Sequence, residues 1–125
     1  MSKTYQNILS KNDFTPNKDW LQIKTIDMHT GGEPLRVIVD GFPELKGNSV
    51  LEYRLNCKEN FDYLRTTLMF EPRGHADMYG CILLPPNDDE GDFGIIFLHN
   101  EGYSTMCGHA IIAISTLAIK MKWVD

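Results

Sequence analysis

A cysteine near the end of the chain stands where a loop changes into an apolar segment. Met106, Cys107, Gly108 and His109 are followed directly by Ala-Ile-Ile-Ala-Ile. If a helix begins here, its first backbone N–H groups lack partners within the helix and its macrodipole adds positive potential. Both effects favour a thiolate over a thiol. Gly108 lets a ligand approach the backbone closely, because it has no side chain. The pattern predicts a reactive Cys107; the alternative is a small buried apolar residue, which is the common role of a lone cysteine.

Composition limits the classes of protein to which this thiol could belong. The 125 residues fall in the range of one domain, and 42% of them are hydrophobic against 23% charged. The net charge of −5, without a basic run, argues against nucleic acid or a membrane surface as a partner. No apolar run approaches the roughly 20 residues that span a bilayer. Residues 1–20 form a polar leader without a signal-peptide core. Three cysteines without a CxxC pair (Cys57, Cys81 and Cys107) indicate reduced thiols, so we expect a cytoplasmic protein.

Two strands and a turn are predicted after the leader. Leu21–Met28 alternates in part, and Leu35–Val39 is rich in Val and Ile, so each is typical of a strand. The segment His29–Pro34 between them contains two glycines and a proline, which force a turn. We therefore expect an antiparallel hairpin, with a turn longer than the tightest types.

The middle of the chain predicts one helix and two further strands. Ser49 and Glu52 have the spacing of a capping box, and apolar residues three or four apart continue to about Met69. Proline and glycine then end the pattern. His75–Leu84 and Phe93–His99 are the predicted strands, and Asn100–Met106 is a predicted loop.

The last predicted helix runs from Cys107 to about Lys120 and is apolar nearly all round. Such a helix is normally buried on every side, which about four strands cannot provide. The sequence therefore looks like part of a domain, with the missing strands supplied from elsewhere.

Five motifs stand in a fixed order between about Ile23 and Ile119. They are Thr25–Pro34, Glu71–Gly80, Asp92–Gly94, His99–Tyr103 and Met106–His109. In these motifs the chain resembles the proline racemase family. The resemblance implies an α+β lobe like that of diaminopimelate epimerase, with a curved, mostly antiparallel sheet around a buried helix. It also implies that residues 21–125 are a partial N-terminal lobe, truncated, of a two-lobe enzyme.

The same resemblance implies a mechanism and a ligand. Family enzymes need no metal, pyridoxal phosphate or other cofactor, and bind a small cyclic amino acid between their lobes. The role of the proton-abstracting base carries over to Cys107, and Gly108 and His109 help to hold the substrate. A second-lobe position, absent from this sequence, holds cysteine in racemases and epimerases and threonine in the related dehydratases. Besides the substrate, the expected partner is a second copy of the chain, in a homodimer.

Two further residues suggest a polar substrate. Ser104 stands at a position where family enzymes that act on proline itself tend to have an apolar residue. Tyr79 stands at a position where they tend to have phenylalanine. The loop Glu101–Met106 looks most like that of the trans-3-hydroxy-L-proline dehydratases. We therefore expect a lyase that converts this substrate to a cyclic imine acid, pyrroline-2-carboxylate. Ser104 as a plain loop residue and Tyr79 as a core residue are the structural alternatives.

Other activities stay open. Cys107 could serve a 4-hydroxyproline epimerase or a proline racemase, or could be the nucleophile of a Cys–His thiol hydrolase. A chain with one lobe could also be an inactive fragment, because catalysis needs groups from both sides. His75 and Asp77 could join His29, His99 or Cys107 around zinc, but the resemblance implies no metal and favours a hydrogen-bonded pair.

Overall fold

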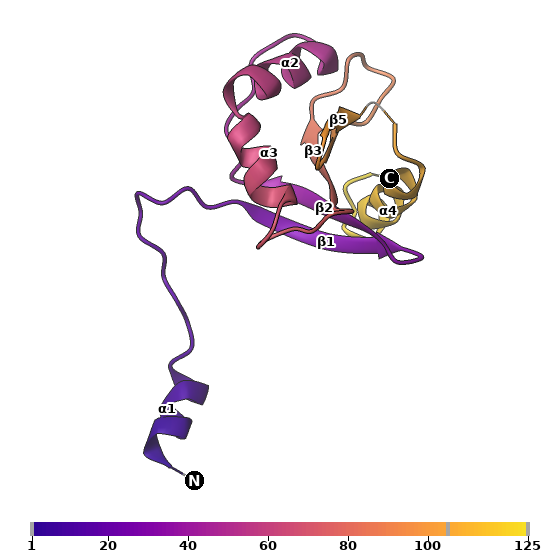
Figure 1. Ribbon diagram of the computed structural model, residues 1–125. Helices are drawn as coiled ribbons and strands as arrows, with labels where there is room; N and C mark the ends of the chain where they lie inside the picture. The colour runs from indigo at the N-terminus through magenta and orange to yellow at the C-terminus, as the bar shows by residue number, and fades with distance from the viewer. Residues whose placement is uncertain (1, 105, 125) are drawn as a thin grey trace.

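The computed structural model describes residues 2–104 and 106–124 and centres on a five-stranded sheet (Figure 1). The strands lie in the order β1-β2-β3-β4-β5, and each neighbouring pair is antiparallel except β2 and β3. The predicted α+β class with a mostly antiparallel sheet is confirmed, with an added strand, β5, where the sequence predicts a loop. The strands are β1 (Lys24–Thr30), β2 (Glu33–Asp40), β3 (Tyr79–Leu84), β4 (Gly94–His99) and β5 (Gly102–Ser104).

The hairpin of β1 and β2 is tighter than predicted. Thr30 pairs with Glu33, so only Gly31 and Gly32 form the loop, with φ of 59° and 93°. Two positive φ values in a two-residue turn match the twist of the strands and explain the glycine pair. The Gly32 N–H donates to Nδ1 of His29 at 3.2 Å, which fixes the turn. The longer turn predicted over His29–Pro34 is wrong, because both strands continue into it.

Two helices, not one, connect the parallel strands β2 and β3. α2 (Val50–Asn60) begins as predicted, since Oγ of Ser49 accepts the Glu52 N–H at 3.2 Å. α3 (Asp62–Met69) follows after a break at Phe61, whose φ of −130° and ψ of 17° are not helical. The predicted single helix is therefore wrong at this residue. The apolar spacing continues through the break, so periodicity could not reveal it.

Helices cover both faces of the sheet (Figure 1). Neighbouring strand residues point to opposite faces. Val37 and Cys81 belong to the core beneath α4 (Gly108–Lys120), whereas Ile38 and Ile82 belong to the core beneath α2 and α3. The sheet thus separates two apolar layers, and the thiol of interest lies at the start of the helix on one of them.

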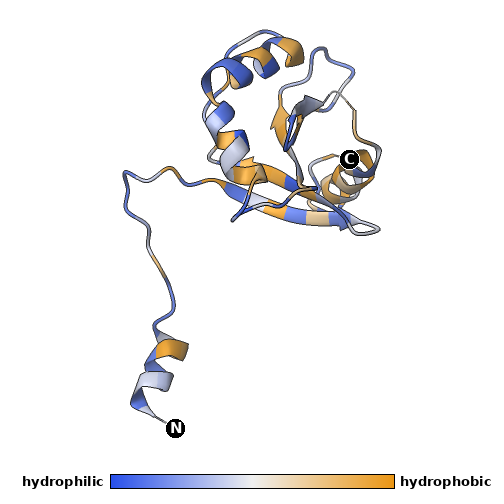
Figure 2. Cartoon of the chain, in the orientation of Figure 1, coloured by the Kyte–Doolittle hydropathy of each residue, from blue (hydrophilic) through white to orange (hydrophobic). Residues whose placement is uncertain are grey.

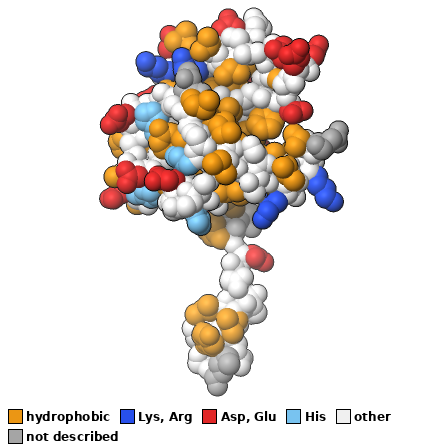
Figure 3. Space-filling model, turned by 90° about the vertical axis from the view of Figure 1, so that its right-hand side faces the viewer, with side chains coloured by type: hydrophobic (Ala, Val, Ile, Leu, Met, Phe, Trp, Pro, Cys, Tyr) orange, Lys and Arg blue, Asp and Glu red, His pale blue; other side chains and the backbone are white. Residues whose placement is uncertain are grey.

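Only one face of α4 is buried among the described residues, in agreement with the expectation that so few strands cannot bury this apolar helix on every side. The buried positions face the sheet: Ala110, Ala113, Ile114, Leu117 and Ala118. On the outer face Ile112 is 58% and Ile119 69% exposed. α4 is hydrophobic along most of its length in Figure 2, and hydrophobic side chains are spread over the same side of the molecule in Figure 3. The missing strands that the sequence predicts would have to cover this face.

The C-terminus of α4 ends in a Schellman motif. The Trp123 N–H bonds to the Ala118 carbonyl at 2.9 Å, and the Lys122 N–H bonds to Ile119 at 3.1 Å. Lys122 has a φ of 60°, a conformation that favours glycine. Beyond the turn, Trp123 lines a cavity together with residues at the ends of β2 and β3.

The polar leader contains a helix that the sequence analysis did not predict. α1 (Lys3–Ser10) begins at Ser2, whose side chain accepts the Tyr5 N–H at 3.1 Å. α1 has no buried residue, and Figure 1 shows it standing away from the sheet. Among the described residues, no helix is long and apolar enough to cross a membrane.

Candidate active site

Cys107 is the N-cap residue of α4, as the sequence predicts. Its φ of −150° and ψ of 109° are extended, and its carbonyl accepts the Ile111 N–H at 3.0 Å. Its side chain makes no capping hydrogen bond, so the sulfur is available for other contacts. Gly108 follows as the first helical residue, and a Cβ added there would meet no atom within 4 Å. The first turn therefore leaves open space where backbone N–H groups can receive an anion.

His109 lies between the thiol and the β1–β2 hairpin. Its Nδ1 is 3.2 Å and its Nε2 is 3.6 Å from Sγ of Cys107. Its Nε2 is also 3.3 Å from the carbonyl oxygen of Pro34. The hydroxyl of Thr30 donates to the His109 carbonyl at 3.1 Å. The hairpin thus holds both the ring and the backbone of the residue that faces the thiol.

Tyr79 packs against this histidine from β3. Its ring centroid is 5.3 Å from that of His109 at an interplanar angle of 79°, and 5.2 Å from that of His99 at 32°. Burial raises the pKa of Tyr79, and the nearby Cys107 and Glu101 raise it further. Because the phenol stays neutral, its O–H remains a hydrogen-bond donor.

Ser104 shapes the loop that precedes the thiol. Its hydroxyl donates to the Met106 carbonyl at 2.7 Å and accepts the Met106 N–H at 3.2 Å. A serine oxygen has two lone pairs, so one is left for a further donor. Thr105, which belongs to the predicted loop, lies outside the described residues.

The other two cysteines are buried in the apolar layers. Cys81 lies in the same core cluster as Cys107; burial, and then the neighbouring Cys107, raise its pKa to about 12. Burial also raises the pKa of Cys57, whose sulfur is 3.6 Å from the Tyr103 hydroxyl. Both side chains are 0% exposed, which accords with structural roles.

A polar network fixes the turn between β4 and β5, which leads to the loop before the thiol. Nη1 of Arg65 donates to the carbonyls of His99 at 2.8 Å and Asn100 at 2.9 Å. Asp62 accepts from Arg65 at 2.7 Å and from the Tyr103 hydroxyl at 2.8 Å. Burial, followed by hydrogen bonds to Cys57 and Asp62, raises the pKa of Tyr103. Sequence reasoning missed this network because Asp62 and Arg65 lie 34 to 41 positions before the residues of the turn that they bind.

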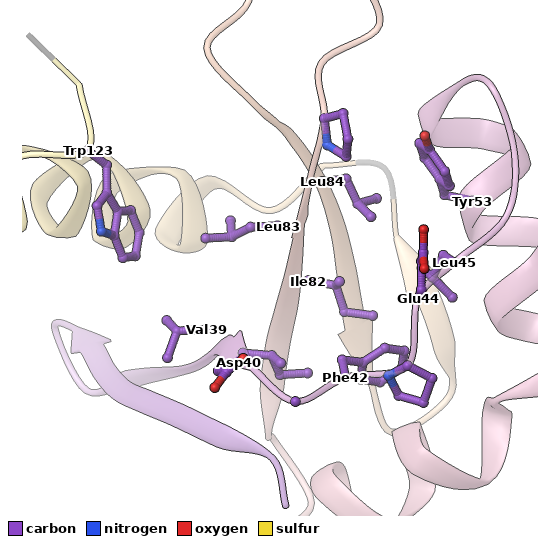
Figure 4. Close-up of a pocket in the computed structure, with 14 residues that line it drawn as sticks. Val39, Asp40, Phe42, Glu44, Leu45, Tyr53, Ile82, Leu83, Leu84 and Trp123 are labelled. Carbon is purple, nitrogen blue, oxygen red and sulfur yellow. The ribbon is translucent and has the colours of Figure 1, made fainter.

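Two cavities lie at opposite ends of the parallel strands. The one in Figure 4, of about 520 Å³, lies where β2 and β3 end and is mainly apolar, with Phe42, Tyr53 and Trp123 in its lining. A smaller one of about 290 Å³ lies at the other end, where its lining includes Tyr79 and His99. The second is the one beside the candidate site.

The predicted strand at His75 and Asp77 is wrong, since β3 begins at Tyr79. The proline and glycine before these residues lead into a turn, in which the Asp77 N–H donates to Nδ1 of His75 at 3.3 Å. Within residues 2–104 and 106–124, no group of three or more His, Cys, Asp or Glu side chains is placed to hold a metal ion.

Sequence comparison identifies relatives of this chain. The chain is 55% identical over 103 residues to the trans-3-hydroxy-L-proline dehydratase of Colwellia psychrerythraea, covering 82% of this chain and 29% of that relative. It is 53% identical over 110 residues to the trans-L-3-hydroxyproline dehydratase of Xenopus tropicalis, covering 88% and 32%. The chain therefore spans about three-tenths of the length of these relatives.

Structural comparison agrees with the sequence comparison. A hydroxyproline epimerase from Agrobacterium vitis, solved with bound trans-4-hydroxy-L-proline, superposes with a TM-score of 0.74 at 25% identity, over 82% of this chain and 31% of that chain. A probable proline racemase from Agrobacterium radiobacter gives 0.75 at 28% identity, over 83% and 31%. The sequence model of the family described as proline racemase matches residues 25–125. The chain belongs to the proline racemase family.

Proposed function

We propose that this chain supplies one half of the active site of a trans-3-hydroxy-L-proline dehydratase, with Cys107 as the base. The observation that carries the proposal is the 55% identity to a relative of that name, against 25% to the epimerase structure. The position of Cys107 at the helix N-cap, with its sulfur free of capping bonds, supports the role of base.

The chemistry asks for a base and for stabilisation of negative charge. The α-proton of an amino acid is weakly acidic, so the carboxylate must accept charge as the Cα–H bond breaks. Backbone N–H groups at the start of α4, beside the open space at Gly108, would hold that carboxylate. Cys107 takes the proton, and its thiolate becomes a thiol.

Loss of the hydroxyl completes the reaction. The electron pair of the Cα–H bond forms the C2–C3 double bond as the C3–O bond breaks. The leaving hydroxide takes a proton and departs as water. The remaining enamine moves a proton from nitrogen to C3 and becomes pyrroline-2-carboxylate.

The stereochemistry of the substrate allows one residue both to remove the α-proton and to protonate the leaving hydroxide. In the trans isomer the hydroxyl and carboxylate lie on opposite faces of the ring, so the α-hydrogen and the hydroxyl share a face. Cys107 would abstract the α-proton on that face and could return it to the departing hydroxide. We therefore expect the cis isomer to be a poor substrate, because its hydroxyl faces away from Cys107.

The remaining predicted residues take positioning roles in this proposal. His109 and Gly108 hold the substrate at the first turn of α4. The spare lone pair of Ser104 accepts the 3-hydroxyl hydrogen, and Tyr79 packs near the ring. A cytoplasmic location and a homodimer stay predictions.

An epimerase or racemase is the second candidate, since structures of both kinds share this fold. The two reactions differ in the second-lobe residue. A cysteine there returns the proton to the opposite face, whereas a threonine leaves elimination as the outcome.

The test supplies the second lobe by grafting. Residues 25–125 replace the matching segment of the Colwellia psychrerythraea dehydratase, and ¹H NMR follows the substrate in D₂O. We expect pyrroline-2-carboxylate, and a loss of about 10³-fold in kcat for Cys107→Ala. Cys57→Ala, which removes a thiol from the other layer, is the matched control and should retain activity. Full activity of Cys107→Ala, or a folded graft that dehydrates no 3-hydroxyproline, would overturn the proposal. The graft takes its second-lobe residue from the dehydratase, so it tests the first lobe and not the choice between elimination and epimerisation.

The thiol hydrolase is tested in the same preparation. It requires an acyl-enzyme on Cys107, visible as an added mass on the peptide that contains Cys107 after incubation with an activated ester. The proton-transfer proposal expects pyrroline-2-carboxylate with deuterium at C3, taken up from D₂O when the enamine becomes the imine, without such an adduct. The 125-residue chain alone is measured in parallel, and its inactivity beside an active graft would identify it as an incomplete enzyme.

A further inference from the structure

The strand β5 carries two side chains that face opposite sides of the sheet. Tyr103 pairs with Leu98, which belongs to the apolar layer beneath α2 and α3, and Tyr103 itself packs against that layer. Ser104 pairs with Phe97, which belongs to the layer beneath α4. Directly paired residues share a face, and neighbours along a strand alternate between faces. Tyr103 therefore lies on one side of the sheet, and Ser104 lies on the side of the thiol.

The backbone pairing of β5 is short. The strand has three residues, stands at the end of the sheet and, among the described residues, pairs only with β4 (Figure 1). A short strand at the edge of a sheet opens easily, because few backbone hydrogen bonds hold it. The position of Ser104 thus depends on what anchors β5 besides its pairing with β4.

The side chain of Tyr103 provides such an anchor. Its hydroxyl donates to Oδ1 of Asp62 at 2.8 Å. The same carboxylate accepts from Nε of Arg65 at 2.7 Å and from Nη2 at 3.0 Å, and these two bonds fix its orientation. The guanidinium of Arg65 also lies over the Tyr103 ring, 5.7 Å from its centroid. A hydrogen bond to a charged acceptor is stronger than one between neutral groups, so the phenol ties β5 firmly to α3.

Ser104 connects this anchor to the candidate site. Its hydroxyl donates to the Met106 carbonyl at 2.7 Å and accepts the Met106 N–H at 3.2 Å. Both bonds hold the residue directly before Cys107, and the remaining lone pair is the one proposed to accept the 3-hydroxyl hydrogen of the substrate. A displacement of about 1 Å in a group that positions the substrate can reduce the rate about a hundredfold. Movement of β5 would therefore be felt in the reaction.

We propose that Tyr103 is a positioning residue of the dehydratase. Through its hydrogen bond to Asp62 it holds β5, and it thereby keeps Ser104 where that hydroxyl accepts the hydrogen bond from the 3-hydroxyl group of the substrate. Because Tyr103 faces the other side of the sheet, its effect on the reaction must pass through Ser104. The inference rests on the proposed function, to which it adds a residue that acts from the opposite apolar layer.

The first test measures the anchor in the 125-residue chain. Tyr103→Phe removes the hydroxyl and keeps the ring and its packing. We expect amide hydrogen exchange in the peptide that covers β5, followed by mass spectrometry, to become about fivefold faster or more. Tyr53→Phe is the matched control, because Tyr53 packs against the same apolar layer but lines the larger cavity. Exchange in β5 should change by less than about twofold in this control.

The second test is a double-mutant cycle in the graft with the second lobe of the Colwellia psychrerythraea dehydratase. Tyr103→Phe should lower kcat/KM for trans-3-hydroxy-L-proline about fivefold, and Ser104→Ala should lower it by at least as much. Asp62→Asn weakens the same anchor from α3 and provides an independent variant. In the Ser104→Ala background, Tyr103→Phe or Asp62→Asn should have less than about twofold further effect, because the group that they position is gone. A merely structural role would give losses that multiply.

Three results would overturn the inference: unchanged exchange of β5 in Tyr103→Phe, losses that multiply in the cycle, or full activity of Ser104→Ala. If one of them occurs while Cys107→Ala still lowers kcat about 10³-fold, the proposed role of Cys107 stands without the inference. If Cys107→Ala retains dehydration, the proposed function fails whatever the results at Tyr103.

Discussion

The hydroxyl of Thr30 donates a hydrogen bond to the backbone carbonyl of His109 at 3.1 Å, across 79 positions of sequence. The bond joins the last residue of β1 to the first turn of α4, the turn that carries the thiol. The hairpin is therefore part of the candidate site, although the sequence analysis predicted no catalytic or substrate-binding side chain in it.

Removal of this hydrogen bond should weaken both the fold and the site. Thr30→Val keeps the β-branched shape and the strand preference, so the lost bond is the main change. We expect a loss of about 1 kcal/mol in the free energy of unfolding by urea, and a several-fold lower kcat of the graft because the first turn of α4 is held less firmly. Thr25→Val on the same strand is the control and should stay within about 0.5 kcal/mol. Equal effects of the two changes would show that the bond to His109 has no special role.

Arg65 should be the most costly of the charged side chains to remove. It is 9% exposed and binds Asp62 and two backbone carbonyls. Arg65→Met keeps the aliphatic length but removes this donor from the two carbonyls and leaves Asp62 with the Tyr103 hydroxyl. A loss of about 2–3 kcal/mol in unfolding free energy is expected. Lys58→Met, on the exposed side of α2, should change the unfolding free energy by less than about 0.5 kcal/mol. A comparable loss in Lys58→Met would contradict the explanation by buried acceptors that lose their donor.

Acid should destabilise the chain through two carboxylates. A hydrogen bond from Arg65 is the main cause that lowers the pKa of Asp62, and one from Arg36 lowers that of Asp27. A carboxyl group whose pKa is lower in the folded chain than in the unfolded chain stabilises the fold at pH values above its unfolded pKa. That contribution disappears as the pH falls through the folded pKa. Urea midpoints should therefore fall between about pH 5 and pH 3.

Asp62→Asn should flatten this decline, whereas Asp89→Asn in the exposed acidic loop should leave its slope as in the unchanged chain. Both variants remove one carboxylate, so they differ only in the partner that is lost. A parallel decline in all three chains would rule out the pair of Asp62 and Arg65 as a source of the acid sensitivity.

Lys122→Gly should stabilise the chain. The φ of Lys122 is 60°, which glycine adopts without steric cost. The gain expected in a thermal or urea unfolding experiment is about 0.5–1 kcal/mol. Lys120→Gly, inside the last turn of α4, is the opposite control and should cost about 1 kcal/mol. Destabilisation by both changes would contradict the left-handed conformation at Lys122.

Local signals in the sequence predicted much of the fold and the start of the site. The apolar run after Gly108 located the N-terminus of α4, and Ser49 located that of α2, because caps depend on near neighbours. The break at Phe61 was missed, since the apolar spacing continues through it. The exposed outer face of α4 accords with the expectation that about four strands cannot cover an apolar helix on every side, although composition does not show which residues would lie on that face.

The contacts that complete the site could not be predicted in this way. His109 meets the Pro34 carbonyl and Thr30 through pairing between distant segments. A backbone carbonyl carries no signature of residue type, so no motif marks Pro34 as a partner. Tyr79 was identified through the family resemblance, while its packing between His99 and His109 depends on the register of β3 with β4.

The parallel pairing of β2 with β3 sets the order in which the site can assemble. Arg36 pairs with Gly80, so the crossover with α2 and α3 must close before β3 brings Tyr79 beside the hairpin. Closing a long loop is slow because its entropy is lost before the contacts form. His109 meets the ring of Tyr79 only after that step, so this packing at the candidate site forms late in folding. A newly made chain would thus carry Cys107 and His109 without Tyr79 beside them until the sheet is in place.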